Sequence, residues 1–103
     1  GIIMQIKDKK VIERLLDFSD CEYLGEIHRI IQEKLELPQW YGNNLDALWD
    51  ALTGIMYVPA NIKIIYKPKK ETSTELSDEV YKIIEVFKEA AQEYNEFTLS
   101  VDM

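Results

Sequence analysis

The sequence contains very little cysteine and histidine. Its 103 residues include one of each, Cys21 and His28. One cysteine excludes an intrachain disulfide and a thiolate metal cluster, which suits the reducing conditions of the cytoplasm. A lone histidine with no cysteine cluster leaves a zinc ion short of ligands. We therefore expect no metal and no cofactor, and we expect His28 to be a partly exposed or capping residue beside the core residue Ile27.

Long apolar runs and glycine-rich motifs are missing as well. No stretch approaches the roughly 18 apolar residues of a membrane-spanning helix, and the first eight residues lack the apolar segment of a signal peptide. These absences lead us to expect a cytoplasmic protein that does not bind a membrane. The four glycines form no phosphate-binding loop, no Ser/His/Asp set is recognisable, and no catalytic motif surrounds Cys21. The sequence therefore favours a protein that is not an enzyme.

Acidic residues outnumber basic ones by nineteen to twelve, which gives a formal charge of −7. A negative surface repels phosphate backbones, so direct nucleic-acid binding is disfavoured. The same surface attracts basic proteins and speeds their encounter, although a net charge also serves solubility alone. The length and the 47% hydrophobic content are those of a single globular domain, residues 1–103, and we expect a monomer.

Hydrophobic spacing predicts an α/β order of elements. Three segments that are apolar or alternate in polarity predict strands: residues 2–6, 62–66 and 97–101. Three segments with helical spacing predict helices: residues 24–37, 44–53 and 76–94. Between the first strand and the first helix, the apolar pairs of residues 7–23 indicate no more than a short amphipathic turn. This order is that of an α/β domain with a parallel sheet and a right-handed crossover between the last two strands.

The helix ends also have recognisable signals. Pro38 ends the first helix, because the residue before a proline avoids the α region. Asn43 or Asn44 caps the second helix, and Gly54 is expected to take the left-handed conformation after it. Ser77 is expected to cap the third helix.

Two aspartates distinguish the helix predicted at residues 44–53. Asp46 and Asp50 lie one turn apart and point away from an apolar stripe of four residues: Leu45, Leu48, Trp49 and Leu52. Like charges at this spacing cost an isolated helix roughly 0.2–0.5 kcal/mol, and Asp50 also lies toward the negative end of the helix dipole. Ala47 and Ala51 are expected to keep the surface beside the pair flat. We interpret the pair as a binding site for a basic partner; the alternative is a solvated face whose aspartates pair with nearby lysines.

Trp40 and Tyr41 precede this helix. Aromatic residues in a loop make good interface anchors, which favours a contact role for Trp40. For Tyr41 two interpretations remain, a contact role or a hydrophobic staple that closes over the start of the helix. Trp49 lies on the apolar stripe, so we expect it to pack in the core.

The segment that carries these residues resembles a known family. The run Leu-Pro-Gln-Trp-Tyr-Gly-Asn-Asn-Leu-Asp-Ala-Leu-Trp-Asp at residues 37–50 closely resembles the signature of the barstar family, the intracellular inhibitors of the ribonuclease barnase. The resemblance continues through Leu52-Thr53-Gly54 and Pro59, and it returns at residues 86–90 and in the last strand. It covers about residues 24–101, while residues 7–23 match poorly.

This resemblance implies a small α/β fold with a three-stranded parallel sheet and about four helices. It also implies a protein that binds a secreted, guanyl-specific ribonuclease as a 1:1 complex and blocks its active site, an antitoxin-like immunity role before export. The loop of Trp40, Tyr41 and Gly42, followed by the acidic helix, would plug the active site and mimic the substrate phosphate.

The resemblance further implies a role for each matching residue. Asp50 would enter the substrate phosphate site and meet its arginines and histidine, and Asp46 would pair with an active-site arginine. Glu89 would add a third carboxylate from the long helix. Trp40, where the family usually has a tyrosine, would cover the catalytic histidine. Supporting contacts would come from three further residues: Asn44, Thr53 and Gly54.

The chain departs from the family at the expected edge of the interface. Ile55 and Tyr57 stand where barstar has a tryptophan and a glutamate, so the resemblance does not identify the partner. Two other interpretations remain. One is a module with the same fold that binds a different basic protein, and the other is a hydrolase in which Asp46, Asp50 and Glu89 hold Mg²⁺.

Overall fold

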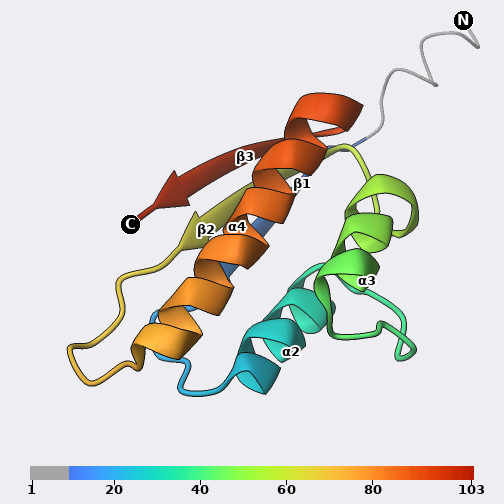
Figure 1. Ribbon diagram of the computed structural model, residues 1–103. Helices are drawn as coiled ribbons and strands as arrows, with labels where there is room; N and C mark the ends of the chain where they lie inside the picture. The colour runs from blue at the N-terminus through green and yellow to red at the C-terminus, as the bar shows by residue number, and fades with distance from the viewer. Residues whose placement is uncertain (1–9) are drawn as a thin grey trace, which may run out of the picture.

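A computed structural model describes residues 10–103 of the chain (Figure 1). The strand predicted at residues 2–6 lies outside the described residues. The elements follow one another in this order: β1 (Ile12–Asp17), α2 (Leu24–Lys34), α3 (Leu45–Asp50), the π-helical turn η1 (Ala51–Ile55), β2 (Ala60–Ile65), α4 (Thr74–Tyr94) and β3 (Phe97–Asp102). No described helix is both long and apolar enough to cross a membrane.

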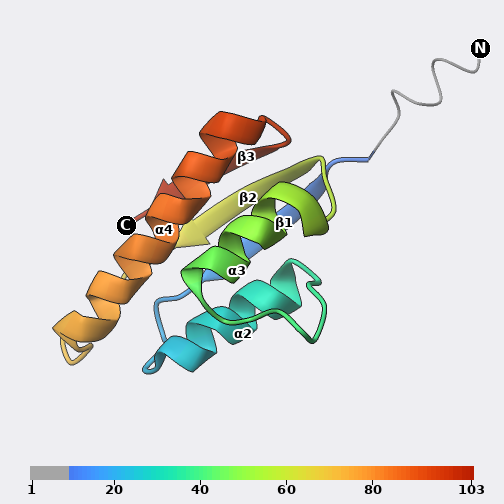
Figure 2. The ribbon, with the colours of Figure 1, turned by 45° about the vertical axis from the view of Figure 1, so that its right-hand side comes forward.

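The three strands form one parallel sheet in the order β1-β2-β3, with β2 at its centre. Ile12, Ala60 and Phe97 lie side by side and set the register. The three α-helices cover one face of this sheet (Figures 1 and 2). The predicted α/β class and the three-stranded parallel sheet are confirmed, whereas the described part of the chain holds three α-helices rather than about four.

Strand β1 corrects the prediction for residues 7–23. The segment interpreted as an amphipathic turn alternates as a strand does, with Leu16 fully buried and Leu15 52% exposed. Two adjacent leucines hid this alternation in the sequence. Pairing with β2 decides the outcome, because it satisfies the backbone of the segment and directs Leu16 into the core.

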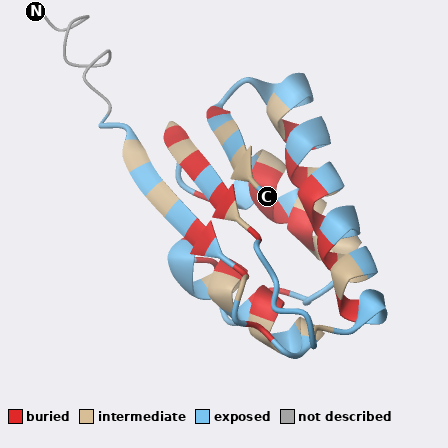
Figure 3. Ribbon diagram, turned by 90° about the vertical axis from the view of Figure 1, so that its left-hand side faces the viewer, coloured by how far each residue is buried: buried red, intermediate tan, exposed pale blue. Residues whose placement is uncertain are grey.

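The core lies between the sheet and the helices (Figure 3). The helix faces predicted from hydrophobic spacing supply many of its fully buried residues, among them Ile27 and Ile31 of α2, Leu48 of α3, and Ile83 and Phe87 of α4. Each side chain of this kind that leaves water contributes about 1.5–3 kcal/mol to folding. The packed core therefore fixes how α3 is rotated, and with it which side chains of α3 face solvent.

Two predicted helix ends are wrong. Helix α2 ends before Pro38 is reached, because Glu36 takes a left-handed φ of 53° and turns the chain out of the helix. Gly54 does not take the left-handed conformation, and no described glycine has a positive φ. The chain instead continues from α3 into η1, where the N–H of Met56 donates to the carbonyl of Ala51 at 2.9 Å.

The two predicted helix caps have different outcomes. The Asn44 cap is confirmed, since its side chain accepts the backbone N–H of Ala47 at 2.8 Å. Ser77 is not a cap: α4 begins earlier, and the side chain of Ser73 accepts a backbone N–H of its first turn. Ser77 instead lies 2.9 Å from the hydroxyl of Tyr66.

His28 is the one buried polar residue in the described part of the chain, with an exposure of 3%. This corrects the prediction of a partly exposed or capping residue. Its Nδ1 lies 2.9 Å from the hydroxyl of Tyr41, so the buried ring has a partner. Burial lowers the pKa of His28 and raises the pKa of Tyr41 to about 12. Both groups are therefore neutral at pH 7, and either can donate to the other.

We expect Leu16→Ala to lower the free energy of unfolding by about 2–5 kcal/mol, because it leaves a cavity in a packed core. Leu15→Ala, the same change on the outer face, should alter it by less than about 1 kcal/mol. Urea denaturation followed by circular dichroism measures both. Equal losses would contradict the strand assignment, which requires neighbouring leucines to face opposite sides.

We also expect the protein to lose stability as the pH falls from 7.5 to 5.5. The pKa of His28 is lower in the folded state than its ordinary value of about 6.5, so the unfolded chain binds more protons once the pH falls below that value. A titration of the ring protons of this sole histidine by NMR measures the folded pKa directly. A value at or above the ordinary one would contradict the prediction.

A His28→Gln variant isolates the contribution of the imidazole to this pH dependence. The loss of stability between pH 7.5 and 5.5 should be smaller in this variant than in the wild-type protein, because the variant has no imidazole to protonate.

Candidate functional site

The loop between α2 and α3 separates its two aromatic residues. Trp40 is 71% exposed, while Tyr41, the next residue, is 7% exposed. The backbone N–H of Tyr41 donates to the carbonyl of Pro38 at 3.0 Å, which closes a tight turn with Trp40 at its tip. The structure thus places Trp40 on the surface, as expected for a contact residue. It places the Tyr41 side chain inside the protein, where it can position the loop but presents little surface to a partner.

The loop then approaches the start of α3 closely. A Cβ atom added to Gly42 would lie 3.2 Å from the Cβ of Ala47, so a larger residue would push the loop away from the helix. The side chain of Asn44 donates to the carbonyl of Gly42 at 3.1 Å while it caps α3. Gly42 and Asn44 therefore determine how the loop joins the helix.

Asp46 and Asp50 lie exposed on α3, as predicted. None of the ion pairs formed among residues 10–103 includes either carboxylate. The described structure therefore does not support the alternative in which both aspartates pair with nearby lysines. The flat surface predicted from two alanines is corrected at Ala51, which is 1% exposed and belongs to the core, while Ala47 is half-buried.

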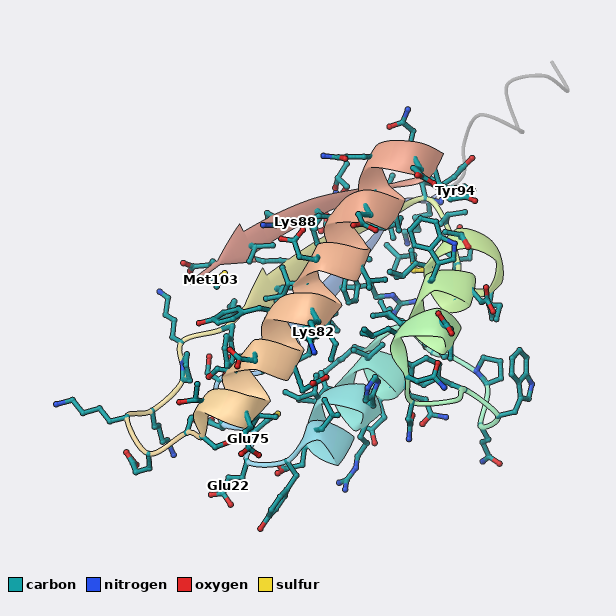
Figure 4. All side chains as sticks on the ribbon, viewed as in Figure 1. Glu22, Glu75, Lys82, Lys88, Tyr94 and Met103 are labelled. Carbon is teal, nitrogen blue, oxygen red and sulfur yellow. The ribbon has the colours of Figure 1, made fainter. Side chains whose placement is uncertain are left out.

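The opposite face of α3 holds it to the rest of the protein. Leu48 and Leu52 are buried, whereas Leu45 and Trp49 are only partly buried against the core. The ring of Trp49 packs edge-on against Tyr94 of α4, with 5.8 Å between ring centroids. Figure 4 shows Tyr94 on the side of α4 that faces α3. Trp49 is thus a packing residue at the border of the core, and its exposed part adds to the surface around α3.

The residues after α3 lie in the π-helical turn η1. Thr53 is half-buried, and its hydroxyl donates to the carbonyl of Trp49 at 2.7 Å. Gly54 is exposed, and a Cβ atom added there would meet nothing within 4 Å. The wider π-helical turn ends at Ile55, which is 39% exposed. Single π-helical turns are frequently found at functional sites.

The loop, α3 and η1 together enclose a groove of about 200 Å³. It is lined by Leu37, Pro38, Trp40, Tyr41, Gly42, Ala47, Asp50, Ala51 and Ile55. Among the described residues, Asp50 supplies the only charged side chain in this lining. The groove can therefore receive a flat group that carries a positive charge, since its walls are largely apolar and its charged group is a carboxylate.

Sequence reasoning predicted four of the lining residues and missed the other five: Leu37, Pro38, Ala47, Ala51 and Ile55. For Ile55 the sequence indicated only a departure from the family at the expected edge of the interface. Nothing in hydrophobic spacing could have placed these residues together, because the turn of the loop and the π-helical turn bring them into one groove.

Glu89 lies exposed on α4, the helix that packs against α3. It is not one of the residues that line the groove, and no ion pair among the described residues includes it. Its predicted part in the site stays a prediction. Within residues 10–103, no three His, Cys, Asp or Glu side chains gather closely enough to hold a metal ion. The Mg²⁺ interpretation of Asp46, Asp50 and Glu89 therefore lacks a ligand cluster.

Cys21 is buried at 6% exposure. Burial, reinforced by the negative charges of Glu26, Asp17 and Asp20, raises the pKa of its thiol to about 11. The thiol is protonated at neutral pH and is a poor nucleophile. This environment agrees with the absence of a catalytic motif around Cys21.

Comparison with known proteins supports the assignment that the site suggests. The family described as Barstar (barnase inhibitor) matches residues 11–102. A protein of Bacillus subtilis (strain 168) named "Putative ribonuclease inhibitor YrdF" is 34% identical over 89 residues, which are 85% of this chain and 96% of that protein. The family match includes β1, the part of the chain that the resemblance seen in the sequence left out. The chain belongs to the barstar family.

Proposed function

We propose that this protein inhibits a secreted, guanyl-specific ribonuclease of the barnase type. The groove beside Asp50 is the observation that carries the proposal. An exposed carboxylate that forms no ion pair with any residue of 10–103 borders the groove, and the exposed Trp40 lines the same groove. A ribonuclease active site is cationic, since it holds a phosphodiester and stabilises its transition state. The two surfaces are complementary in charge.

The rigid support of these groups favours tight binding. Asp46 and Asp50 project from a helix whose other face is packed in the core, so little conformational freedom is lost when they are desolvated. Carboxylates on such a helix can replace the substrate phosphate and accept charge-assisted hydrogen bonds from arginine. In the proposed complex Asp50 enters the phosphate site, Asp46 pairs with an arginine, and Glu89 adds a third carboxylate from α4.

The remaining predicted residues have supporting roles in this complex. Trp40 covers the catalytic histidine of the nuclease. Gly42, Asn44, Thr53 and Gly54 shape the loop and the helix around the acidic pair, and Tyr41 supports the loop from within. The complex is 1:1, its inhibitor is a cytoplasmic monomer when free, and the −7 charge steers a basic nuclease toward it.

Ile55 and Tyr57 would influence the choice of nuclease. Ile55 lines the groove, and Tyr57 is 47% exposed with its hydroxyl donating to the carbonyl of Lys10 at 3.1 Å. An isoleucine and a tyrosine offer the partner an apolar edge where barstar offers a tryptophan and a carboxylate. We therefore propose a cognate nuclease other than barnase, with weaker binding to barnase itself.

An inhibition assay against a panel of guanyl-specific ribonucleases that includes barnase tests the proposal. We expect a stoichiometric loss of RNA cleavage for at least one of them. If every enzyme of the panel stays fully active in the presence of excess protein, the result contradicts the proposal and favours the alternative, a module of the same fold that binds another basic protein.

We expect Asp50→Ala to weaken binding of the inhibited nuclease by about 2–5 kcal/mol, because the nuclease cations lose their partner in a desolvated site. This range is not specific to the present chain, since the barnase–barstar complex is itself a source of such values. The free energy of unfolding should stay equal or rise slightly, because Asp50 has no ion-pair partner in the described structure and opposes the helix dipole.

Asp78→Ala is the matched control for Asp50→Ala. Asp78 is also an exposed helical aspartate, and its removal changes the net charge by the same amount. Isothermal titration calorimetry should show near wild-type affinity for this control. Equal losses of affinity in both variants would attribute the effect to net charge rather than to the groove.

A further inference from the structure

Helix α2 touches the loop of the proposed site at two points, one helical turn apart. Nδ1 of His28 lies 2.9 Å from the hydroxyl of Tyr41, and Nε2 of Gln32 donates to the carbonyl of Pro38 at 2.8 Å. Residues four apart on a helix lie on the same face. One face of α2 thus presents two polar side chains to the back of the loop.

These two contacts lie on either side of the exposed Trp40 in the sequence. Pro38 precedes it by two residues, and Tyr41 follows it directly. The carbonyl of Pro38 accepts both the Gln32 side chain and the backbone N–H of Tyr41, and the N–H of Leu37 donates to the carbonyl of Gln32 at 2.9 Å. The turn that carries Trp40 is therefore held to the last turns of α2 at three positions.

The chemistry of His28 indicates more than core packing. Its side chain is almost completely removed from water, and it is the one buried polar residue among residues 10–103. An aliphatic side chain of similar size would fill the same space without needing a partner. A buried polar pair instead favours one arrangement of the two groups, because any other arrangement leaves a desolvated nitrogen or hydroxyl unpaired.

We propose that His28 and Gln32 are positioning residues of the inhibitory surface, which hold the turn of Trp40 and the adjoining groove wall in the conformation that binds the nuclease. They touch no nuclease atom themselves. Their effect is to keep the fraction of molecules in the binding conformation high, since the apparent dissociation constant rises as that fraction falls. This inference rests on the proposed function.

The sharpest test compares Tyr41→Phe with a double variant that combines Tyr41→Phe and His28→Leu. The single change keeps the ring and removes the hydroxyl, so it leaves the histidine unpaired and should lower both the melting temperature and the affinity for the nuclease. The double change removes both polar groups, which should restore most of the melting temperature. If the pair positions the loop, the affinity should stay about tenfold or more below wild type, as expected when the binding conformation falls to a tenth of the population.

The affinity is measured by calorimetry at 25 °C with barnase and with the nuclease of the panel that the wild-type protein inhibits most strongly. Variants that are fully folded at 25 °C differ in affinity only through their folded state. A lower melting temperature alone then does not alter the dissociation constant. If the double variant recovers its affinity together with its melting temperature, His28 and Tyr41 form a core pair and nothing more.

Gln32→Ala tests the second contact. We expect its dissociation constant to rise several-fold, because the carbonyl of Pro38 loses a donor. Gln92→Ala is the matched control, since Gln92 is exposed on the helix α4 and lines a separate hollow beside β3. It should leave the affinity unchanged.

Amide hydrogen exchange in the free protein gives a readout that needs no nuclease. In Tyr41→Phe and Gln32→Ala, the amides of Leu37 and Tyr41 should exchange faster, while the Ala47 amide at the Asn44 cap should not change. Unchanged exchange at the first two amides would overturn the positioning role. If the wild-type protein binds no nuclease, the proposed function fails; if it binds and the variants bind equally well, only the present inference fails.

Discussion

The surface around Trp40 depends on the burial of its neighbour Tyr41. Of these two adjacent residues in the loop between α2 and α3, only Tyr41 is buried, and its hydroxyl pairs with the buried ring of His28. Trp40 is exposed on the turn and lines the groove. From Tyr41 the loop continues to Gly42 and Asn44, whose contacts join it to α3 beside the groove that Asp50 lines.

Helix α3 combines a well-packed face with an unfavourable one. Leu48 is buried in the core and α3 packs against α4, while no ion pair among residues 10–103 compensates the repulsion between Asp46 and Asp50. The energy that this arrangement costs is small compared with the burial of the apolar face. The fold can therefore hold two like charges in place. A cationic partner that binds there would supply the compensating positive charge.

Long, regular patterns were readable from the sequence and short or irregular ones were not. The spacing of apolar residues identified α2, α3 and α4, because a packed helix buries one face along its whole length. β1 was missed because Leu15 and Leu16 are both apolar, and only pairing with β2 shows which of them is inside. Gly54 was misread because a helix that widens into a π-helical turn has no sequence signal comparable to a left-handed glycine.

The local sequence was sufficient for the fold class, the acidic face of α3 and the family of the chain. These features depend on residues close together in the chain, whose spacing alone sets which way they point. Three-dimensional packing was needed for the burial of His28 and Tyr41, thirteen residues apart, and for the groove that unites Pro38, Asp50 and Ile55. Contacts between separate segments depend on how the loop and η1 turn. Those turns depend in turn on how the helices and strands pack together in the core.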